Sequence, residues 1–168
     1  MERERTILHT IVQTPLCPIL LVSEDGALTY LCLAGQRHVP AQIGEEGYDA
    51  AIEEAERWLS VYFSGRDPGF LPPLRLHGTP FERRVWALLS EIPYGVSSTY
   101  GALARCLEAD TGKRMAAQAV GQAVGRNPVS LIVPCHRILG ANGALTGYGG
   151  GIERKRALLT LEKIPFAE

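Results

Sequence analysis

The chain has 168 residues, of which 46% are hydrophobic and 21% are charged, enough to bury the core of one domain or of two small ones. The first residues, MERERTILHT, lack the apolar stretch of a secretory signal, and no apolar run approaches the roughly 18 residues that span a bilayer. We therefore expect a protein without membrane contact, located in the cytoplasm and associated with the nucleoid if bacterial.

Charge is unevenly divided along the chain. Residues 1–75 hold 6 Lys and Arg against 11 Asp and Glu, a net −5, whereas residues 76–168 hold 11 against 7, a net +4. A basic second half favours contact with a polyanion such as nucleic acid. On charge alone, a chance division of a near-neutral chain explains this asymmetry as well as contact with a polyanion does.

The spacing of cysteines and histidines argues against a disulfide framework and a metal site. The four cysteines include no CxxC pair, and disulfide frameworks belong mostly to small secreted chains. The four histidines form no compact ligand motif with them, although distant residues can assemble a zinc site. We expect no metal and no cofactor.

The first half of the chain is predicted to form a small sheet followed by a helix. Three β-rich runs (5–13, 17–23 and 27–34) are separated by the turn signals TP and EDG, and residues 35–47 are expected to be a loop. Residues 48–65 predict an amphipathic helix ending at Gly65. Its apolar face comprises Ile52, Ala55, Leu59, Tyr62 and Phe63.

A linker is expected at residues 67–78, which contain three prolines and two glycines. We place a domain boundary there, between an N-terminal structural domain (1–75) and a C-terminal functional domain (76–168). The sequence Thr79-Pro80-Phe81-Glu82 then forms a capping box, so a helix should start there and reach about Glu91.

Two short helices should follow. Ser98 or Ser97 is expected to cap a helix at 99–107, and a polar loop leads to another at 115–125, an order typical of a helix-turn-helix. Asn142-Gly143 favours a type I′ turn, and a last helix is expected at 152–163.

The stretch IVPCHRILG (132–140) interrupts apolar residues with Cys135, His136 and Arg137. An arbitrary cysteine is usually buried filler. Here Pro134 stiffens the approach, and the Arg137 cation could favour the thiolate, the nucleophilic form of cysteine. Adjacency does not by itself place the His136 ring on the sulfur, because neighbours on an extended chain point to opposite faces. We expect Ile132 and Val133 to form a buried strand leading to the thiol.

The helix at 115–125 is rich in alanine and contains Gly121 and Gly125, although each glycine costs about 1 kcal/mol relative to alanine. Close packing inside the protein is the commoner reason for such a helix. The alternative is close approach to a ligand, because a helix with small side chains suits the narrow minor groove of DNA.

Residues 79–164 resemble the O6-alkylguanine-DNA alkyltransferases, also called methylated-DNA–protein-cysteine methyltransferases. The motifs that carry the resemblance are SSTYGALA, AVGQAVGRNPVSLIVPCHRILG, NGALTGYGGG and the ALLTLE of the last helix. The resemblance implies an α+β fold, with a small N-terminal sheet-and-helix domain (RNase H-like) before a helical winged helix-turn-helix domain. It also implies a monomer that repairs double-stranded DNA containing O6-alkylguanine, and possible action on O4-alkylthymine.

The family resemblance assigns the chemistry to four residues. Cys135 would accept the alkyl group, His136 would deprotonate it through a bridging water, and Glu162 would orient the imidazole. Glu162 would otherwise be read as a solvated helix carboxylate. Asn127 would hydrogen-bond the backbone that links the helix at 115–125 to the Cys135 segment.

The same resemblance assigns the base pocket. The target nucleotide must be flipped out of the duplex, and the hydroxyl of Tyr100 would donate to guanine N3. Tyr148 and the Gly149 N–H would line the pocket, the carbonyls of Cys135 and Ile138 would accept the exocyclic amine, and Pro134 would shape the turn. The resemblance also implies a set of residues that contact the minor groove: Gln118, Ala119, Gly121, Gln122, Gly125, Arg126 and Arg137.

Two positions depart from the family pattern. Gln118 stands where an arginine commonly enters the vacated base stack, so we expect weaker DNA engagement or slower flipping. Gly149 stands where some members have serine, and we expect little effect beyond a roomier pocket. The alternatives are an alkyltransferase-like lesion sensor, a winged-helix regulator without chemistry, and a cysteine hydrolase; none of them explains Cys135 and the small-residue helix together.

Overall fold

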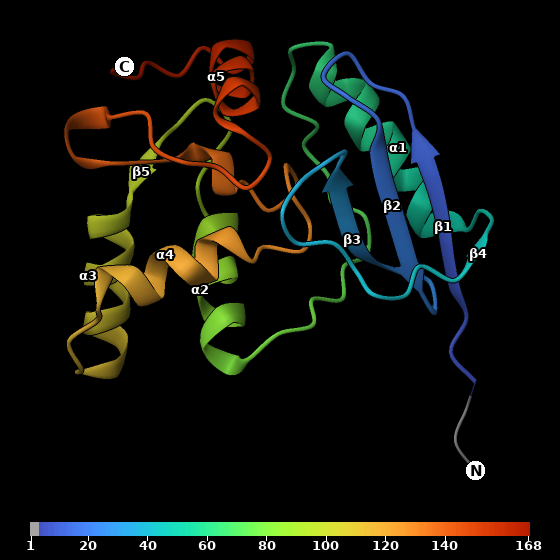
Figure 1. Ribbon diagram of the computed structural model, residues 1–168, viewed down its shortest axis with the longest axis horizontal. Coiled ribbons are helices and arrows are strands. Elements are labelled where there is room, and N and C mark those ends of the chain that lie inside the picture. Colours follow the sequence, from blue (N-terminus) through green and yellow to red (C-terminus); the bar gives the residue numbers. More distant parts are fainter. Residues whose placement is uncertain (1–3) are drawn as a thin grey trace.

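The N-terminal half is a sheet with a helix packed against it (Figure 1). The computed structural model describes residues 4–168, and within them the sheet has the strand order β3-β2-β1-β4. Strands β1 (Ile7–Val12), β2 (Ile19–Glu24) and β3 (Ala27–Leu33) pair antiparallel, as predicted. Strand β4 (Glu45–Glu46) was expected to be loop, but it pairs parallel with Leu8 and His9.

Helix α1 (Ala50–Phe63) lies against the first three strands and begins at Asp49, whose side chain accepts a hydrogen bond from the Ile52 N–H. Four of the predicted residues are buried, Phe63 is only partly buried, and Ala51 and Trp58 are buried in addition. The chain then leaves the helix at Gly65, where φ is +88°. Tyr62, in the last turn, is fully buried, and its ring extends toward the C-terminal half.

The two halves are joined by backbone hydrogen bonds along the edge of β3. The Leu31 N–H donates to Pro128 O at 3.0 Å, and the Ser130 N–H donates to Leu31 O at 3.1 Å. One apolar core runs through both halves. The Cys135 segment is therefore held against the sheet by main-chain pairing as well as by packing.

The C-terminal half consists of helices and short turns. Helix α2 (Pro80–Ser90) starts with the predicted capping box between Thr79 and Glu82. Helices α3 (Tyr100–Thr111), α4 (Ala117–Gly125) and α5 (Ile152–Leu161) follow. A short strand β5 (Ser98–Thr99) pairs parallel with β6 (Ile138–Leu139). The whole is the mixed α+β fold that was predicted.

Two local predictions in this half were wrong. Ser98 pairs in β5, so α3 begins one residue later and Thr99, rather than Ser97 or Ser98, caps it by accepting the Ala102 N–H at 3.1 Å. The helix also continues to Thr111, through residues expected to be loop, because Gly112 provides a left-handed end at φ +68°.

The approach to Cys135 is a turn rather than the expected strand. Leu131 has φ +72°, and the Val133 N–H donates to Val129 O at 3.0 Å. A 3₁₀ turn, η1 (Cys135–Arg137), follows directly. The predicted Asn142-Gly143 turn is confirmed inside η2 (Ala141–Gly143): both residues have positive φ and the Ala144 N–H donates to Ala141 O.

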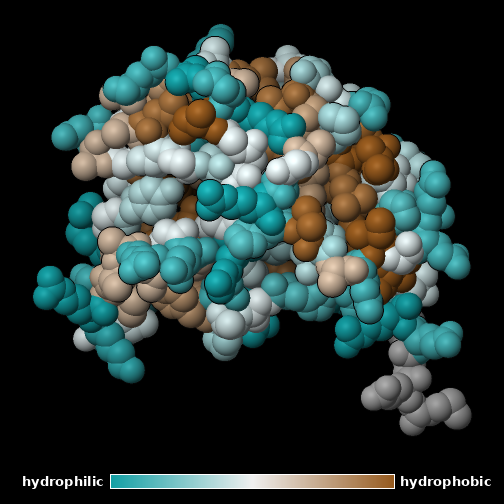
Figure 2. All heavy atoms as spheres, in the orientation of Figure 1, coloured by the Kyte–Doolittle hydropathy of each residue, from teal (hydrophilic) through white to brown (hydrophobic). Residues whose placement is uncertain are grey.

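The surface is mixed in character. Figure 2 shows hydrophobic side chains gathered over β1 and β2, whereas hydrophilic ones are spread over much of the rest of this face. Ile11 of β1 is one of the exposed large hydrophobic residues. Of the helices in residues 4–168, none has the length and apolar character needed to cross a membrane.

Candidate active site

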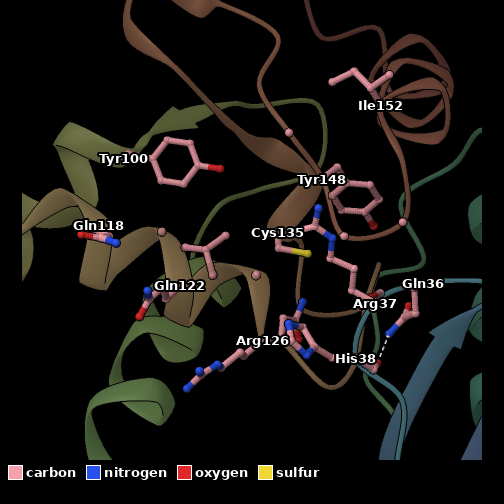
Figure 3. Close-up of a pocket in the computed structure, with 18 residues that line it drawn as sticks. Gln36, Arg37, His38, Tyr100, Gln118, Gln122, Arg126, Cys135, Tyr148 and Ile152 are labelled. Carbon is pink, nitrogen blue, oxygen red and sulfur yellow. Dashed lines mark hydrogen bonds between the residues drawn. The ribbon is translucent and has the colours of Figure 1, made fainter.

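A pocket of about 640 Å³ opens between α4, the loop at 36–38 and the glycine-rich loop at 147–150 (Figure 3). Cys135 lies in its wall, with the sulfur pointing toward Tyr148. The structure brings ten of the predicted site residues to this pocket: Tyr100, Gln118, Gly121, Gln122, Gly125, Arg126, Asn127, Cys135, Tyr148 and Gly149.

The Cys135 thiol is 8% exposed and stands at the start of η1, directly after Pro134. Burial raises the pKa of this thiol. The neighbouring Asn127 amide, the positive charge of Lys155 and the nearby Tyr148 hydroxyl act in the opposite direction and lower it. The thiolate, once formed, is therefore surrounded by groups that stabilise it.

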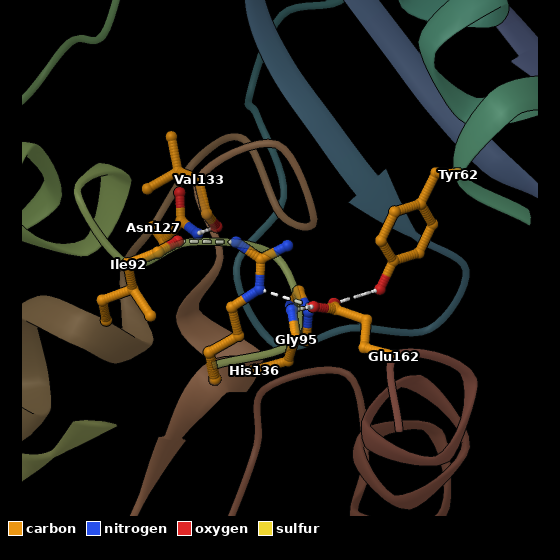
Figure 4. A network of polar contacts seen from close by, with 8 residues as sticks. Tyr62, Ile92, Gly95, Asn127, Val133, His136 and Glu162 are labelled. Carbon is orange, nitrogen blue, oxygen red and sulfur yellow. Dashed lines mark hydrogen bonds and ion pairs between the residues drawn. The ribbon is translucent and has the colours of Figure 1, made fainter. Parts of the chain in front are cut away.

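Behind the thiol lies a buried set of polar residues that we call the Glu162 cluster: Glu162, His136, Arg137, Tyr62 and the Gly95 N–H (Figure 4). Glu162 Oε2 accepts from His136 Nε2 at 2.5 Å and from the Tyr62 hydroxyl at 2.6 Å. Glu162 Oε1 accepts from Arg137 Nε at 2.8 Å and from the Gly95 N–H at 3.0 Å. Burial alone would raise the pKa of Glu162, but these donors outweigh it and lower the pKa to about 2.

The cluster determines which nitrogen of His136 carries the proton. Burial lowers the pKa of His136, against the opposing effect of Glu162, so the ring is neutral at pH 7. Ionised Glu162 can only accept, so the single ring proton resides on Nε2. Nδ1 is then an acceptor, and within residues 4–168 it has no hydrogen-bond partner. Among the described residues, His136 Nδ1 is thus an acceptor that no donor occupies.

Arg137 is buried, which corrects the prediction that its side chain contacts the minor groove. Its side chain is buried, bonded through Nε to Glu162 and through one terminal nitrogen to Ile92 O at 2.8 Å. Because η1 turns the chain, its guanidinium points away from the pocket and pairs with a carboxylate that would otherwise be an isolated buried charge. Glu162 is likewise buried rather than solvated.

Asn127 makes the predicted backbone contacts. Its Nδ2 donates to Val133 O at 2.6 Å, and its Oδ1 accepts from the Val129 N–H at 3.0 Å. Both bonds cross the turn that precedes the thiol. The end of α4 and the Cys135 segment are therefore held in a defined relation.

Gly121, Gly125 and Ala119 of α4 are open rather than packed, so close packing inside the protein does not explain these three small residues. A Cβ added at Gly125 would meet no atom within 4 Å, and one at Gly121 would only reach Tyr100 at 4.0 Å. Ala119 is exposed as well, outside the pocket lining. The buried side of the helix is formed by Val120, Ala123 and Val124.

The glycine-rich loop contains one crowded position, Gly150. A Cβ at Gly150 would stand 2.6 Å from Leu33 Cδ1 and 2.7 Å from Tyr148 Cε2. A Cβ at Gly149 would meet only Gly125 O at 3.8 Å, an ordinary contact, so a serine would fit there. Ile138 and Pro134 lie buried beneath this loop region, outside the pocket lining.

Several residues of the site were not identified from the sequence. Lys155 of α5 is fully buried and donates through Nζ to Ile138 O at 2.6 Å; burial lowers its pKa to about 8. Arg37 and His38 come from the N-terminal half and line the pocket, where Arg37 extends toward Tyr148. Tyr62 looked like one more apolar position of α1. The only available signal concerned Lys155, which lies three and four residues before Leu158 and Leu159 and so shares the buried face of α5 with them.

Comparison with known proteins agrees with this arrangement. Residues 80–164 match the family model "6-O-methylguanine DNA methyltransferase, DNA binding domain". A methylated-DNA–protein-cysteine methyltransferase of Mycobacterium leprae is 43% identical over 152 residues, 90% of each chain. One of Methanosarcina acetivorans is 40% identical over 92% of this chain and 97% of its own.

Solved structures agree with the sequence relatives. The crystal structure of Mycobacterium tuberculosis O6-methylguanine methyltransferase superposes with a TM-score of 0.80 at 42% identity, covering 94% of this chain and 93% of its own. The structure of the Mycobacterium tuberculosis protein in complex with DNA gives the same TM-score, with 93% and 92% covered. The chain therefore belongs to the O6-methylguanine-DNA methyltransferase family.

Proposed function

We propose that this protein repairs O6-alkylguanine in double-stranded DNA by moving the alkyl group irreversibly to Cys135. The observation that carries the proposal is the thiol itself: it opens into a pocket between α4 and the glycine-rich loop, with a neutral His136 and an ionised Glu162 behind it. Named relatives with methyltransferase activity favour this function over a lesion sensor or a regulator without chemistry.

The proposed reaction uses the Glu162 cluster to form the thiolate. The Cys135 proton passes, through a bridging water, to His136 Nδ1, and Glu162 stabilises the resulting imidazolium. The thiolate attacks the alkyl carbon in line; the S–C bond forms, the C–O6 bond breaks, and the electron pair leaves with guanine. The thioether contains no S–S bond for cellular thiols to open, so each molecule acts once.

Protonated tyrosines assist the departing base. Burial raises the pKa of Tyr100, and raises that of Tyr148 well above its usual value, so both hydroxyls remain donors at pH 7. Tyr100 would donate to guanine N3, where negative charge develops. The Gly149 N–H would face O6, and the carbonyls of Cys135 and Ile138 would accept the exocyclic amine above Pro134.

The DNA would be bound through its minor groove by a monomer. The open, small-sided face of α4 (Gln118, Ala119, Gly121, Gln122, Gly125) and Arg126 at its end fit a groove only about 6 Å wide. In this proposal α3 and α4 belong to a winged helix-turn-helix domain at 76–168. Residues 1–75 form an RNase H-like supporting domain.

The test is a single-turnover mass measurement. The protein is incubated with a duplex containing O6-methylguanine, digested, and the Cys135 peptide is weighed. We expect one added methyl group on Cys135, and none on the corresponding peptide of the Cys135→Ala variant. Sequence-selective binding without a mass change would instead support a regulator, and repeated ester turnover would support a hydrolase.

Gln118 offers a prediction on DNA binding. Gln118→Arg should tighten binding to lesion-containing duplex about tenfold at low salt, and steepen the salt dependence by about one unit, because a cation at this site releases one more counterion. It should also speed alkyl transfer. Titrations at several salt concentrations measure both effects. Gln13→Arg, exposed on the N-terminal half, is the matched control; equal effects in both variants would contradict a specific role for position 118.

A further inference from the structure

Tyr62 connects the N-terminal half to the acid–base residues of the C-terminal half. It lies in the last full turn of α1, 74 residues before His136 and 100 before Glu162 in sequence. Its hydroxyl donates to Glu162 Oε2 at 2.6 Å, and it stands 3.3 Å from His136 Nε2 (Figure 4). Among the groups bonded to Glu162, Tyr62 comes from the half that lacks the thiol.

The Tyr62 hydroxyl shares one oxygen atom with His136. Glu162 Oε2 accepts from Tyr62 and from His136 Nε2, while Oε1 accepts from Arg137 and the Gly95 N–H. With two donors on each oxygen, the plane of the carboxylate is defined. Removal of the Tyr62 hydroxyl leaves Oε2 with His136 alone, so the carboxylate can rotate and the imidazole can follow it.

The packing of the Tyr62 ring leaves its hydroxyl little freedom. The ring stacks on Trp58 with centroids 5.0 Å apart and planes 11° from parallel. It also meets Phe63 and Tyr94 edge-on, at 5.3 and 6.1 Å. Because Trp58 and Phe63 hold the ring from the N-terminal half and Tyr94 holds it from the C-terminal half, the packing of the ring sets the position of the hydroxyl.

We propose that Tyr62 is a positioning residue for alkyl transfer, and that the N-terminal domain contributes through it directly to the acid–base chemistry. The hydroxyl holds Glu162 so that His136 keeps its proton on Nε2 and presents Nδ1 as the base toward Cys135. This inference rests on the proposed function. It gives the sheet-and-helix domain a task beyond support, since the donor is delivered by α1.

The pH dependence of the reaction is the property that this role should control. The charged and titratable groups around His136 and Glu162 come from η1, α1, α5 and the segment after α2, and they are Arg137, Tyr62, Lys155, Tyr94 and Cys135. Of these groups, Tyr62 donates to Glu162 Oε2, and it shares that oxygen with His136. Without Tyr62, His136 is a less ordered base, and the thiol must lose its proton at higher pH.

Tyr62→Phe is the decisive variant, because it removes the hydroxyl and keeps the stacked ring. We expect single-turnover transfer from an O6-methylguanine duplex to slow about tenfold at pH 7. The pH of half-maximal rate should move upward by about one unit, while duplex affinity stays unchanged. Tyr94→Phe is the matched control: the Tyr94 hydroxyl is also buried beside this cluster but has no hydrogen-bond partner in residues 4–168.

The outcomes separate this inference from the proposed function. If Tyr62→Phe and Tyr94→Phe give the same rates and pH profiles, the positioning role is wrong. If Tyr62→Phe is too unstable for rate measurements, ¹⁵N spectra of His136 at low temperature decide: a mixture of tautomers supports the inference, and an unchanged Nε2–H form overturns it. A wild-type protein that transfers no methyl group would refute the proposed function itself.

Discussion

Glu162→Ala should lower the free energy of unfolding by about 3–5 kcal/mol and slow alkyl transfer by about a hundredfold or more. Glu162 is the shared acceptor for Arg137, Tyr62, His136 and the Gly95 N–H. Its removal leaves a guanidinium buried without its counter-charge, which costs far more than the loss of a surface pair. Denaturant unfolding and single-turnover kinetics at pH 7 measure the two effects.

Glu153→Ala is the matched control for this variant. Glu153 lies in the first turn of α5, is paired with Arg156, and its side chain is 79% exposed. We expect its loss to change the unfolding free energy by no more than about 0.5 kcal/mol. If the two variants were equally stable, the Arg137–Glu162 pair would contribute nothing beyond a surface pair.

The stability difference between wild type and Glu162→Ala should also depend on pH. The folded-state pKa of Glu162 is about 2, below its ordinary value of 4.5, so folding favours the ionised form. The resulting stabilisation is complete above pH 4.5 and is lost as the pH falls from 4.5 toward 2. Unfolding at pH 7 and at pH 3 should show the difference shrinking in acid.

Lys155→Met should slow transfer at pH 7 about tenfold and move the pH of half-maximal rate upward. The Lys155 ammonium lowers the pKa of the Cys135 thiol against the effect of burial, and methionine fills a similar volume without the charge. Single-turnover rates across pH measure the change. Lys163→Met, the same substitution at an exposed residue just after α5, should leave the profile unmoved; a shift of equal size there would remove the case for Lys155.

The pH dependence of the unfolding free energy provides a second, independent test of the buried Lys155 charge. Burial lowers the pKa of Lys155 from 10.5 to about 8, so folding disfavours the charged form and the destabilisation is complete below about pH 8. It is relieved as the pH rises from about 8 to 10.5. The stability of wild type relative to Lys155→Met should therefore increase over this interval, as followed by denaturant unfolding.

Local patterns were sufficient for most of the fold. The alternation of β-rich runs and turns identified β1, β2 and β3, and the Thr79–Glu82 capping box marked the start of α2, because both signals depend on nearest neighbours. Strand β4 was missed because its two residues, Glu45 and Glu46, form a strand only by pairing with β1. Thr99 replaced the predicted serines as the cap because helix α3 begins one residue later than expected, at Tyr100.

The sequence by itself determined which residue is the nucleophile candidate. Asn127, Pro134, Cys135 and His136 lie within ten residues of one another. Their relative positions therefore depend mainly on local backbone geometry. Figure 3 places the thiol of Cys135 in a pocket beside α4, and a Cβ added at Gly121 or Gly125 of that helix would meet no close neighbour. The side chains that give this thiol its environment lie elsewhere in the chain.

Only the tertiary structure decided how the thiol is supported. Arg137, adjacent in sequence, turns inward to pair with Glu162, whereas Arg37 and Tyr62 arrive from the other half of the molecule. Lys155 becomes a buried cation only because α5 packs over η1. Burial converts such distant residues into strong electrostatic partners, because charges interact more strongly away from water. That environment is a property of the packed fold, and no single stretch of sequence contains it.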